Sequence, residues 1–387
     1  MKIVYCLNSI RYLGGIQRVT IVKANALAEI EGNEVYVVVT DNKEGVCVEP
    51  LSTKVNLVDL DINHYKNDQN RSYISNLIVG LFKRFKQRKV LKRHLNLIQP
   101  DIVISVGTSE KYMIPTMSGR SWKIVREFHF ARNYRVSLAD SRLKKTIGHL
   151  SNFIEFNIGK YLLRWDRIVV LSNEDRLINW QNRENVTVIP NPTSFISCSV
   201  SPLNSRTVIS LGRLDYQKNY SSLIKAFRKV AEKHPDWELK IYGTGWQKAL
   251  LQKLIEELNL QENVKLMSYT SDVKSCLLES SMFALSSINE GFPLVLVEAM
   301  ECGVPVVSYQ CPCGPKDIIT DGVDGFLVPV NDEKAMADRI CRLIENDELR
   351  RKMGAAAKET AKKYHIENIT KQWMQLFNEL INTESTK

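Results

Sequence analysis

The stretch Ser286-Ser287-Ile288-Asn289-Glu290-Gly291-Phe292-Pro293-Leu294-Val295-Leu296-Val297-Glu298-Ala299-Met300 predicts the end of a strand, a short loop and a helix. Pro293 suits the first position of that helix, and Gly303 followed by Pro305 predicts its end. The helix is apolar on every side except at Glu298, so we expect it to be buried. Because a carboxylate in a buried helix needs hydrogen-bond donors, Glu298 is a candidate binding residue.

The predicted helix start is also a candidate phosphate site, because its first N–H groups lack partners within the helix and lie at the positive end of the helix dipole. Glu298 lies one turn beyond Leu294, so one small ligand could place a phosphate at the loop Gly291–Leu294 and a hydroxyl pair at Glu298. Glu290 lies on the same loop. The structural alternative is a buried Glu298 paired with Lys or Arg, and a Glu290 that is an ordinary surface residue.

These two glutamates, in the setting E-G-F-P-L-x-x-x-E-A-x-x-x-G-x-P-V-V, resemble the signature of the family 4 retaining glycosyltransferases, which have the GT-B fold. In that family the first glutamate contacts the transferred sugar, the loop amides hold the diphosphate, and the second glutamate binds the ribose hydroxyls. The resemblance therefore implies these roles for Glu290, for the donor-binding loop and for Glu298. The loop residues are Gly291, Phe292, Pro293 and Leu294.

Length and composition predict a globular protein of two domains. The chain has 387 residues, of which 44% are hydrophobic and 25% charged. We find no apolar run long enough to span a membrane, and the N-terminus resembles a first strand more than a signal peptide. The eight cysteines follow no disulfide pattern. Cys311 and Cys313 form the one close pair, but no second pair or His cluster accompanies them, so we expect reduced cysteines and no metal site.

The positive charge is concentrated in the first half of the chain. Residues 1–190 carry 29 Lys and Arg against 18 Asp and Glu, whereas the remainder carries 24 against 25. A basic half suggests an anionic partner, which could be nucleic acid, an acidic membrane surface or a pyrophosphate-bearing substrate. A helix predicted over 73–97 combines apolar residues at helical spacing (Ile78, Leu81, Phe82, Phe85) with many Lys and Arg, and the stretch 141–165 has a similar mixture. Such a helix can lie on an acidic membrane, or it can simply pack its apolar side against the protein.

In the first half, predicted strands alternate with helices, which favours a doubly wound parallel sheet. The strands are expected at 2–8, 34–39, 55–60, 101–105, 123–127, 167–171 and 186–189. Gly14 and Gly15 follow the first strand and allow close approach of a ligand, although a tight turn without a ligand is the alternative. The resemblance implies that this Gly-Gly loop faces the sugar nucleotide.

Three further residues of the first half are candidate acceptor contacts. His129 follows a strand end, and ligands bind at that edge of such a sheet. By resemblance His129 is a catalytic candidate that contacts the sugar or the acceptor. Arg126 ends the same strand, and Asn191 belongs to the I-P-N segment at which the resembled family leaves its first domain.

The second half starts again with a strand at 207–211 and the loop Gly212-Arg213-Leu214-Asp215-Tyr216-Gln217-Lys218-Asn219. An Arg and a Lys five positions apart in one strand-to-helix loop can reach one diphosphate together. The string G-R-L-x-x-x-K-N also matches the resembled family, which implies that Arg213 and Lys218 neutralise the leaving diphosphate. An ordinary exposed pair is the alternative.

Two more positions are candidate donor contacts. Gly243 follows a strand predicted at 238–242, and its turn would border the same cleft. Tyr269 closes a strand that begins at Val264, and in the resembled family the backbone after that strand meets the nucleotide base. A strand is also expected at 305–309, and residues from 331 onward should be largely helical. The pattern G-x-x-G-F-L-V at 322–328 resembles another segment of the family and is interpreted as scaffolding.

The resemblance implies a GT-B architecture of two Rossmann-like α/β domains. We assign a basic acceptor-side domain to 1–195, a donor-side domain to 196–365 and a final helix crossing back to the first domain to 366–387. The implied reaction is retaining transfer of a hexose-type sugar from a nucleotide diphosphate, preferably a UDP-sugar, to a saccharide acceptor, without a metal or other cofactor.

The basic half favours an acceptor linked to lipid pyrophosphate, as in surface polysaccharide synthesis, and a peripheral position at the cytoplasmic face of the membrane. Two alternatives stay open. A sugar-nucleotide epimerase on the same fold would need no acceptor. A nucleic-acid-binding protein is less favoured, because the basic stretches lack an aromatic platform pattern, and we expect no nucleic-acid partner.

Overall fold

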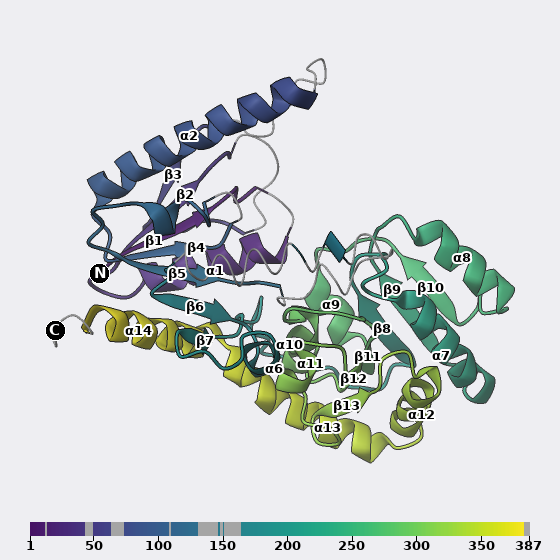
Figure 1. The fold of residues 1–387 in the computed structure, drawn as a ribbon. Helices are drawn as coiled ribbons and strands as arrows, with labels where there is room; N and C mark the ends of the chain where they lie inside the picture. The colour runs from purple at the N-terminus through teal and green to yellow at the C-terminus, as the bar shows by residue number, and fades with distance from the viewer. Residues whose placement is uncertain are drawn as a thin grey trace.

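The computed structural model describes residues 1–11, 14–42, 49–62, 73–107, 110–130, 146–147, 150 and 164–382. Two α/β units lie side by side, each built around its own sheet (Figure 1). The basic stretch 141–165 falls largely outside the described residues. No helix in the described part of the chain is long and apolar enough to cross a membrane.

The first unit contains a seven-stranded parallel sheet in the order β3-β2-β1-β4-β5-β6-β7. Its inner strands consist mainly of Val and Ile, the composition expected of parallel strands covered on both faces. The strands are β1 (Lys2–Leu7), β2 (Glu34–Val39), β3 (Val55–Asp59), β4 (Ile102–Ser105), β5 (Lys123–Glu127), β6 (Arg167–Val170) and β7 (Val186–Val188). The helices include α1 (Gly15–Ala28), α2 (Tyr73–Ile98), the short 3-10 helix η1 (Ile114–Thr116) and α6 (Asn173–Ile178).

The second unit contains a six-stranded parallel sheet in the order β10-β9-β8-β11-β12-β13. The strands are β8 (Thr207–Leu211), β9 (Glu238–Tyr242), β10 (Val264–Met267), β11 (Met282–Leu285), β12 (Val306–Tyr309) and β13 (Gly325–Val328). The helices are α7 (Tyr220–Lys233), α8 (Lys248–Glu257), α9 (Val273–Leu278), α10 (Leu294–Glu301), α11 (Pro315–Ile318), α12 (Glu333–Ile344) and α13 (Asp347–Ala361), followed by the 3-10 helix η3 (Lys362–Tyr364).

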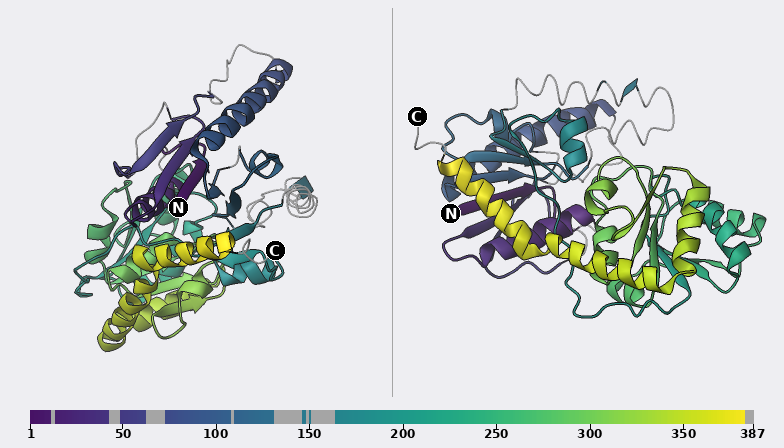
Figure 2. Two further views of the ribbon diagram at one scale, coloured as in Figure 1. Left: turned by 90° about the vertical axis from the view of Figure 1, so that its left-hand side faces the viewer. Right: turned by 90° about the horizontal axis from the view of Figure 1, so that it is seen from below.

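The last helix, α14 (Ile366–Asn382), returns to the first unit and lies beside α1 (Figure 2). Its apolar side, including Trp373 and Phe377, is buried in the same core as Tyr5 and Leu27. The final helix thus contributes apolar side chains to a core that otherwise belongs to the start of the chain.

Both sheets reverse their strand order beside their first strand, between β1 and β4 and between β8 and β11. In open α/β sheets, ligands bind in the crevice outside the carboxyl ends of the strands at such a switch point. The loops after β1, β8 and β11 leave their sheets at these points. They carry most of the predicted site residues.

The predicted helices and strands occur where the sequence indicated, with one small correction at the decisive stretch. Pro293 caps α10 instead of occupying its first position, and the helix begins at Leu294. The φ angle of Pro293 is −75°, but its ψ of 85° is not helical. The seven described cysteines are free, and burial raises the pKa of the Cys311 and Cys313 thiols.

Candidate active site between the two domains

A cavity of about 750 Å³ lies between the two units, within the range that suits a small-molecule ligand. Loops of the first unit supply one wall, from Gly14 to Arg18, at His129 and Phe130, and at Asn191 and Ser194. The second unit supplies the other wall through the loops after β8, β9, β10 and β11 and the first turns of α10. The two walls meet closely at Gly291, where an added Cβ would lie 2.4 Å from the carbonyl oxygen of His129. A side chain at this position would force the two units apart.

The structure brings nearly all of the predicted site residues to this cavity. Its lining includes Gly14, Gly15, His129, Asn191, Arg213, Lys218, Gly243, Tyr269, Glu290, Gly291, Phe292, Pro293, Leu294 and Glu298. Arg126 is the exception. Its buried guanidinium donates hydrogen bonds to the Ser105 hydroxyl at 2.7 Å and to the Gly107 carbonyl at 2.5 Å. Arg126 therefore bonds to groups at the end of β4 and does not line the cavity.

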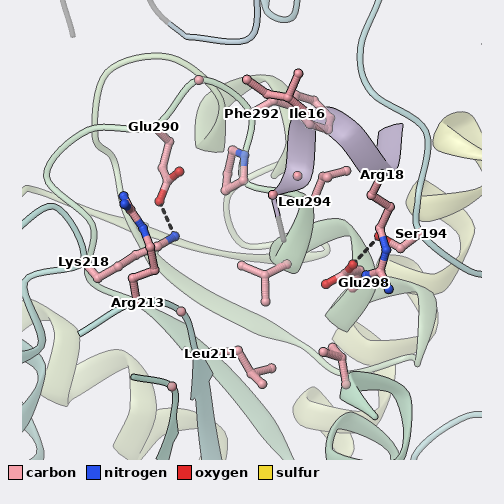
Figure 3. A pocket seen from close by; sticks show the side chains of 18 of the residues that line it. Ile16, Arg18, Ser194, Leu211, Arg213, Lys218, Glu290, Phe292, Leu294 and Glu298 are labelled. Carbon is pink, nitrogen blue, oxygen red and sulfur yellow. Dashed lines mark hydrogen bonds and ion pairs between the residues drawn. The ribbon is translucent and has the colours of Figure 1, made fainter. Parts of the chain in front are cut away.

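Glu290 and Lys218 form a close ion pair on one side of the cavity (Figure 3). The Lys218 Nζ donates to Glu290 Oε1 at 2.7 Å, and the two side chains are only 14% and 8% exposed. The loops that carry them are joined by the backbone and side chain of Gln217, which bonds Ile288 N and Asn289 O at 2.9 Å each. The pair is thus held rigidly.

Arg213 lies beside this pair but is far more accessible, with 72% of its side chain exposed. Its guanidinium contacts Asp215 Oδ2 at 3.0 Å and donates to Gln217 Oε1 at 3.2 Å. One loop therefore presents two cations of different exposure, an enclosed ammonium and an exposed guanidinium, toward the same space.

Glu298 lies on the opposite side of the cavity, close to Ser194 and Arg18 (Figure 3). The Ser194 hydroxyl donates to Glu298 Oε1 at 2.5 Å. Burial raises the pKa of the Glu298 carboxyl, although Ser194, Arg18 and Lys218 oppose that shift. A desolvated carboxylate with acceptor capacity to spare can accept hydrogen bonds from ligand hydroxyls.

The start of α10 lies between these two polar groups. Residues 291–295 line the cavity together with the apolar side chain of Ile16. The positive end of the α10 dipole therefore faces the cavity and adds to the charge of Lys218 and Arg213. An elongated ligand can place an anionic group here while its hydroxyls reach Glu298.

A buried ionic cluster supports His129 beneath the first wall. Lys23 of α1 forms an ion pair with Glu127, and Glu127 Oε1 lies 3.4 Å from His129 Nε2. Burial raises the pKa of Glu127, but Lys23, His129 and Arg126 together lower it below its usual value. Burial lowers the pKa of His129 to about 4, so its imidazole is neutral at pH 7.

Sequence reasoning missed the two residues that lie beside Glu298, Arg18 and Ser194. Arg18 occupies the first turn of α1, directly after the Gly-Gly loop, and contacts Glu49 at 3.0 Å. That position could have been found from the same helix-start argument as the glycines. Ser194 lies in a serine-rich connection between β7 and β8, and nothing in the sequence links it to a glutamate 104 positions away.

Within the described residues, no group of three or more His, Cys, Asp and Glu side chains is arranged to hold a metal ion. Lys218 and Arg213 lie on one side of the cavity, and the Glu298 carboxylate with Arg18 lies on the other.

Comparison with known proteins agrees with this geometry. Residues 196–360 match the family model described as "Glycosyl transferases group 1". An uncharacterized glycosyltransferase of Haemophilus influenzae is 28% identical over 96% of this chain and 98% of its own length. A Campylobacter jejuni alpha-1,4-N-acetyl-D-galactosaminyltransferase, whose acceptor is named as a GalNAc-containing saccharide on PP-undecaprenol, is 25% identical over 95% of this chain and 96% of its own.

Among solved structures, S. aureus TarM in complex with fondaparinux, alpha-GlcNAc-glycerol and UDP superposes with a TM-score of 0.74. The two sequences are 18% identical, and the superposition covers 97% of this chain and 99% of the TarM chain. The two α/β units with a cleft between them therefore form a GT-B fold. Residues 196–360 match the glycosyltransferase family model, and the chain as a whole is similar to glycosyltransferases of the family 4 type.

Proposed function

We propose that this enzyme transfers a hexose-type sugar, with retention of configuration, from a nucleotide diphosphate to a saccharide hydroxyl. One observation carries the proposal. A single cavity has Glu298 and Ser194 at one end, Lys218 and Arg213 at the other, and the start of α10 between them. This polarity matches a donor with a ribose at one end and a diphosphate-linked sugar at the other.

In the proposed reaction, the acceptor hydroxyl attacks the anomeric carbon on the face from which the diphosphate departs. The new C–O bond forms as the bond to phosphate breaks, and the hydroxyl proton passes to a diphosphate oxygen. Lys218, Arg213 and the α10 N–H groups stabilise the charge on the leaving group, so the proposal assigns neither a metal nor a side-chain base. Glu290 orients the sugar, and neutral His129 contacts the sugar or the acceptor.

The donor we favour is a UDP-sugar, because the structurally similar TarM is a UDP complex. The acceptor we favour is a saccharide linked to a lipid diphosphate, because the Campylobacter relative is named for such a substrate. The proposed setting is the assembly of a bacterial surface polysaccharide at the cytoplasmic face of the membrane.

The exposed side of α2 supports a membrane-associated acceptor. Phe82 and Phe85, about halfway along α2, are 71% and 70% exposed. Exposed basic residues follow on the same side, including Lys86, Lys89 and Arg93. Apolar side chains followed by cations suit a helix that lies on an anionic lipid surface.

The test of the donor is thermal stabilisation by UDP-, GDP-, ADP- and dTDP-sugars in the wild type and in Glu298→Ala. A ligand that binds only the folded protein raises Tm, so one nucleotide class should do so, and the variant should lose the shift. Conversion of the donor sugar to its epimer in the absence of an acceptor would favour the epimerase instead. If no nucleotide sugar shifts Tm in the presence or absence of a lipid-linked saccharide extract, the proposal is wrong.

The test of the membrane contact is flotation with vesicles of phosphatidylglycerol or of phosphatidylcholine at low salt. We expect binding to the anionic vesicles alone, and we expect Phe82→Ser/Phe85→Ser to lose it while keeping the Tm shift with the donor. Equal binding by this double variant would exclude α2 as the contact.

A further inference from the structure

Outside the cavity, two aromatic side chains form an exposed pair at its rim. Tyr216 belongs to the loop after β8 and Trp246 to the loop after β9, and their side chains are 60% and 59% exposed. Their ring centroids lie 4.5 Å apart with an interplanar angle of 71°. In this edge-to-face arrangement the two rings form a corner and leave ring faces open to solvent.

The backbone beneath the pair is rigid. Leu214 N donates to Thr244 O at 2.8 Å, and Gln247 N donates to Leu214 O at 3.1 Å. Gly245 allows this contact, because an added Cβ would lie 2.3 Å from the Leu214 carbonyl oxygen. Leu214 is itself fully buried. A single exposed aromatic residue needs no explanation, but two that are held together on locked loops form a preorganised surface.

This surface is continuous with the cavity. The same two loops supply Arg213, Gln217, Gly243 and Thr244 to the cavity lining, whereas Tyr216 and Trp246 lie just outside it. On the loop that carries Tyr216, the guanidinium of Arg213 and the carboxylate of Asp215 are held 3.0 Å apart. Flat apolar faces beside planar charged groups match a pyranose ring, which has an apolar C–H face and hydroxyls around its edge.

We propose that Tyr216 and Trp246 form a saccharide subsite that binds a pyranose ring of the acceptor, beyond the residue that receives the new sugar. The proposal rests on the transferase function above and extends the acceptor from the first domain onto two loops of the second domain, beside the residues that we assign to the donor. The donor base is a less suitable occupant, because neither ring lines the cavity that holds the proposed nucleotide contacts.

The test is saturation-transfer NMR with methyl α-glucoside, methyl α-galactoside, their N-acetylated counterparts and the α-1,4-linked disaccharides of each, in the presence of UDP. We expect transfer to the ring C–H protons of at least one of these probes in the wild type. The signal should indicate about tenfold weaker binding in Trp246→Ala and in Tyr216→Ala, because one stacking contact is lost. Trp246→Phe should restore most of it.

Leu250→Ala is the matched control, because Leu250 is an exposed apolar residue in the first turn of α8 beyond Trp246. It should keep the saccharide signal, and every variant should keep the Tm shift with UDP. The subsite proposal is overturned if no saccharide probe binds the wild type, or if Trp246→Ala binds the probes as the wild type does. It is also overturned if Trp246→Ala and Leu250→Ala both lose binding to anionic vesicles, because the exposed side chains would then contact a membrane and not a saccharide. Trp246-dependent saccharide binding without a Tm shift from any of the nucleotide sugars would reject the transferase and leave the subsite standing.

Discussion

Glu290 and Glu298 lie on one loop and helix, and both are buried in the wall of the same cavity, yet their partners differ. Glu290 accepts a hydrogen bond from the Lys218 ammonium at 2.7 Å. Glu298 accepts one from the Ser194 hydroxyl, and burial raises its pKa. The first is a charge neutralised by its cation, and loss of that cation would leave an uncompensated buried carboxylate. The second is a desolvated charge that gains stability when ligand hydroxyls reach it. The loop thus holds one satisfied carboxylate and one prepared for a ligand.

The largest expected effect is that of Lys218→Met, which removes the cation paired with Glu290. The substitution leaves the Glu290 carboxylate buried without its cation, which should lower the free energy of unfolding by about 3 kcal/mol. It should also lower kcat by about 10²- to 10³-fold, because one group that stabilises the leaving diphosphate is gone. Urea unfolding and steady-state kinetics measure the two effects separately.

The control is the double variant Lys218→Met/Glu290→Gln, which removes both charges. It should recover most of the lost stability without recovering activity. If the double variant is as unstable as the single one, the ion pair is not the source of the loss. Wild-type kcat in Lys218→Met would exclude the proposed contact with the leaving group.

Glu298→Gln tests the other half of the contrast. Removing a poorly solvated charge should raise the stability of the ligand-free protein at pH 7, because the pKa of Glu298 is raised in the folded state. The same change should weaken donor binding by about 10- to 100-fold, since hydrogen bonds to a charged acceptor are replaced by weaker ones. Thermal unfolding with and without the nucleotide sugar measures both. A loss of stability in the ligand-free variant would contradict this account of Glu298.

The sequence predicts those site residues that share one strand–loop–helix unit. Glu290, Glu298, Arg213 and Lys218 each lie within one strand–loop–helix unit, so short spacings place them at the carboxyl edge of a parallel sheet. The alternation of strands and helices likewise predicts both sheets. The local sequence pattern is sufficient to predict site residues that lie on one loop.

Contacts between distant segments are not predictable in this way. Ser194 meets Glu298, and Lys23 meets Glu127, across 104 positions in each case. Arg126 illustrates the corresponding error. It ends a strand as His129 follows one, but its guanidinium is bonded to Ser105 on the neighbouring strand. Which way a side chain points at a strand end depends on the partner strand, and the sequence does not contain that information in local form.

The first domain contains a further buried carboxylate, Glu127, which lies beside His129. Titration of His129 should make the free energy of unfolding depend on pH. The pKa of His129 is about 4 in the folded protein and 6.5 unfolded. The unfolded chain therefore binds more protons between these values, and stability falls as the pH is lowered through this window. From pH 7 to pH 5 the loss should be about 2 kcal/mol.

Urea unfolding at both pH values measures this loss, and His129→Asn should reduce it because the variant cannot take up the proton. Glu127 acts in the same direction at lower pH, since its pKa is also lowered in the folded state. Equal pH dependence in the wild type and in His129→Asn would mean that other groups cause the acid sensitivity.

The smallest expected effect separates the two cations of one loop. Arg213 is mostly exposed, and its contacts with Asp215 and Gln217 are surface contacts, so Arg213→Met should change stability by less than about 0.5 kcal/mol. We expect kcat/KM to fall by about tenfold at low salt and by less at high salt, because an exposed charge is screened whereas the enclosed Lys218 is not. Kinetics at two ionic strengths therefore distinguish the cations. If kcat/KM responds to salt in the same way in Arg213→Met and Lys218→Met, the difference in exposure between the two cations does not determine how salt screens them.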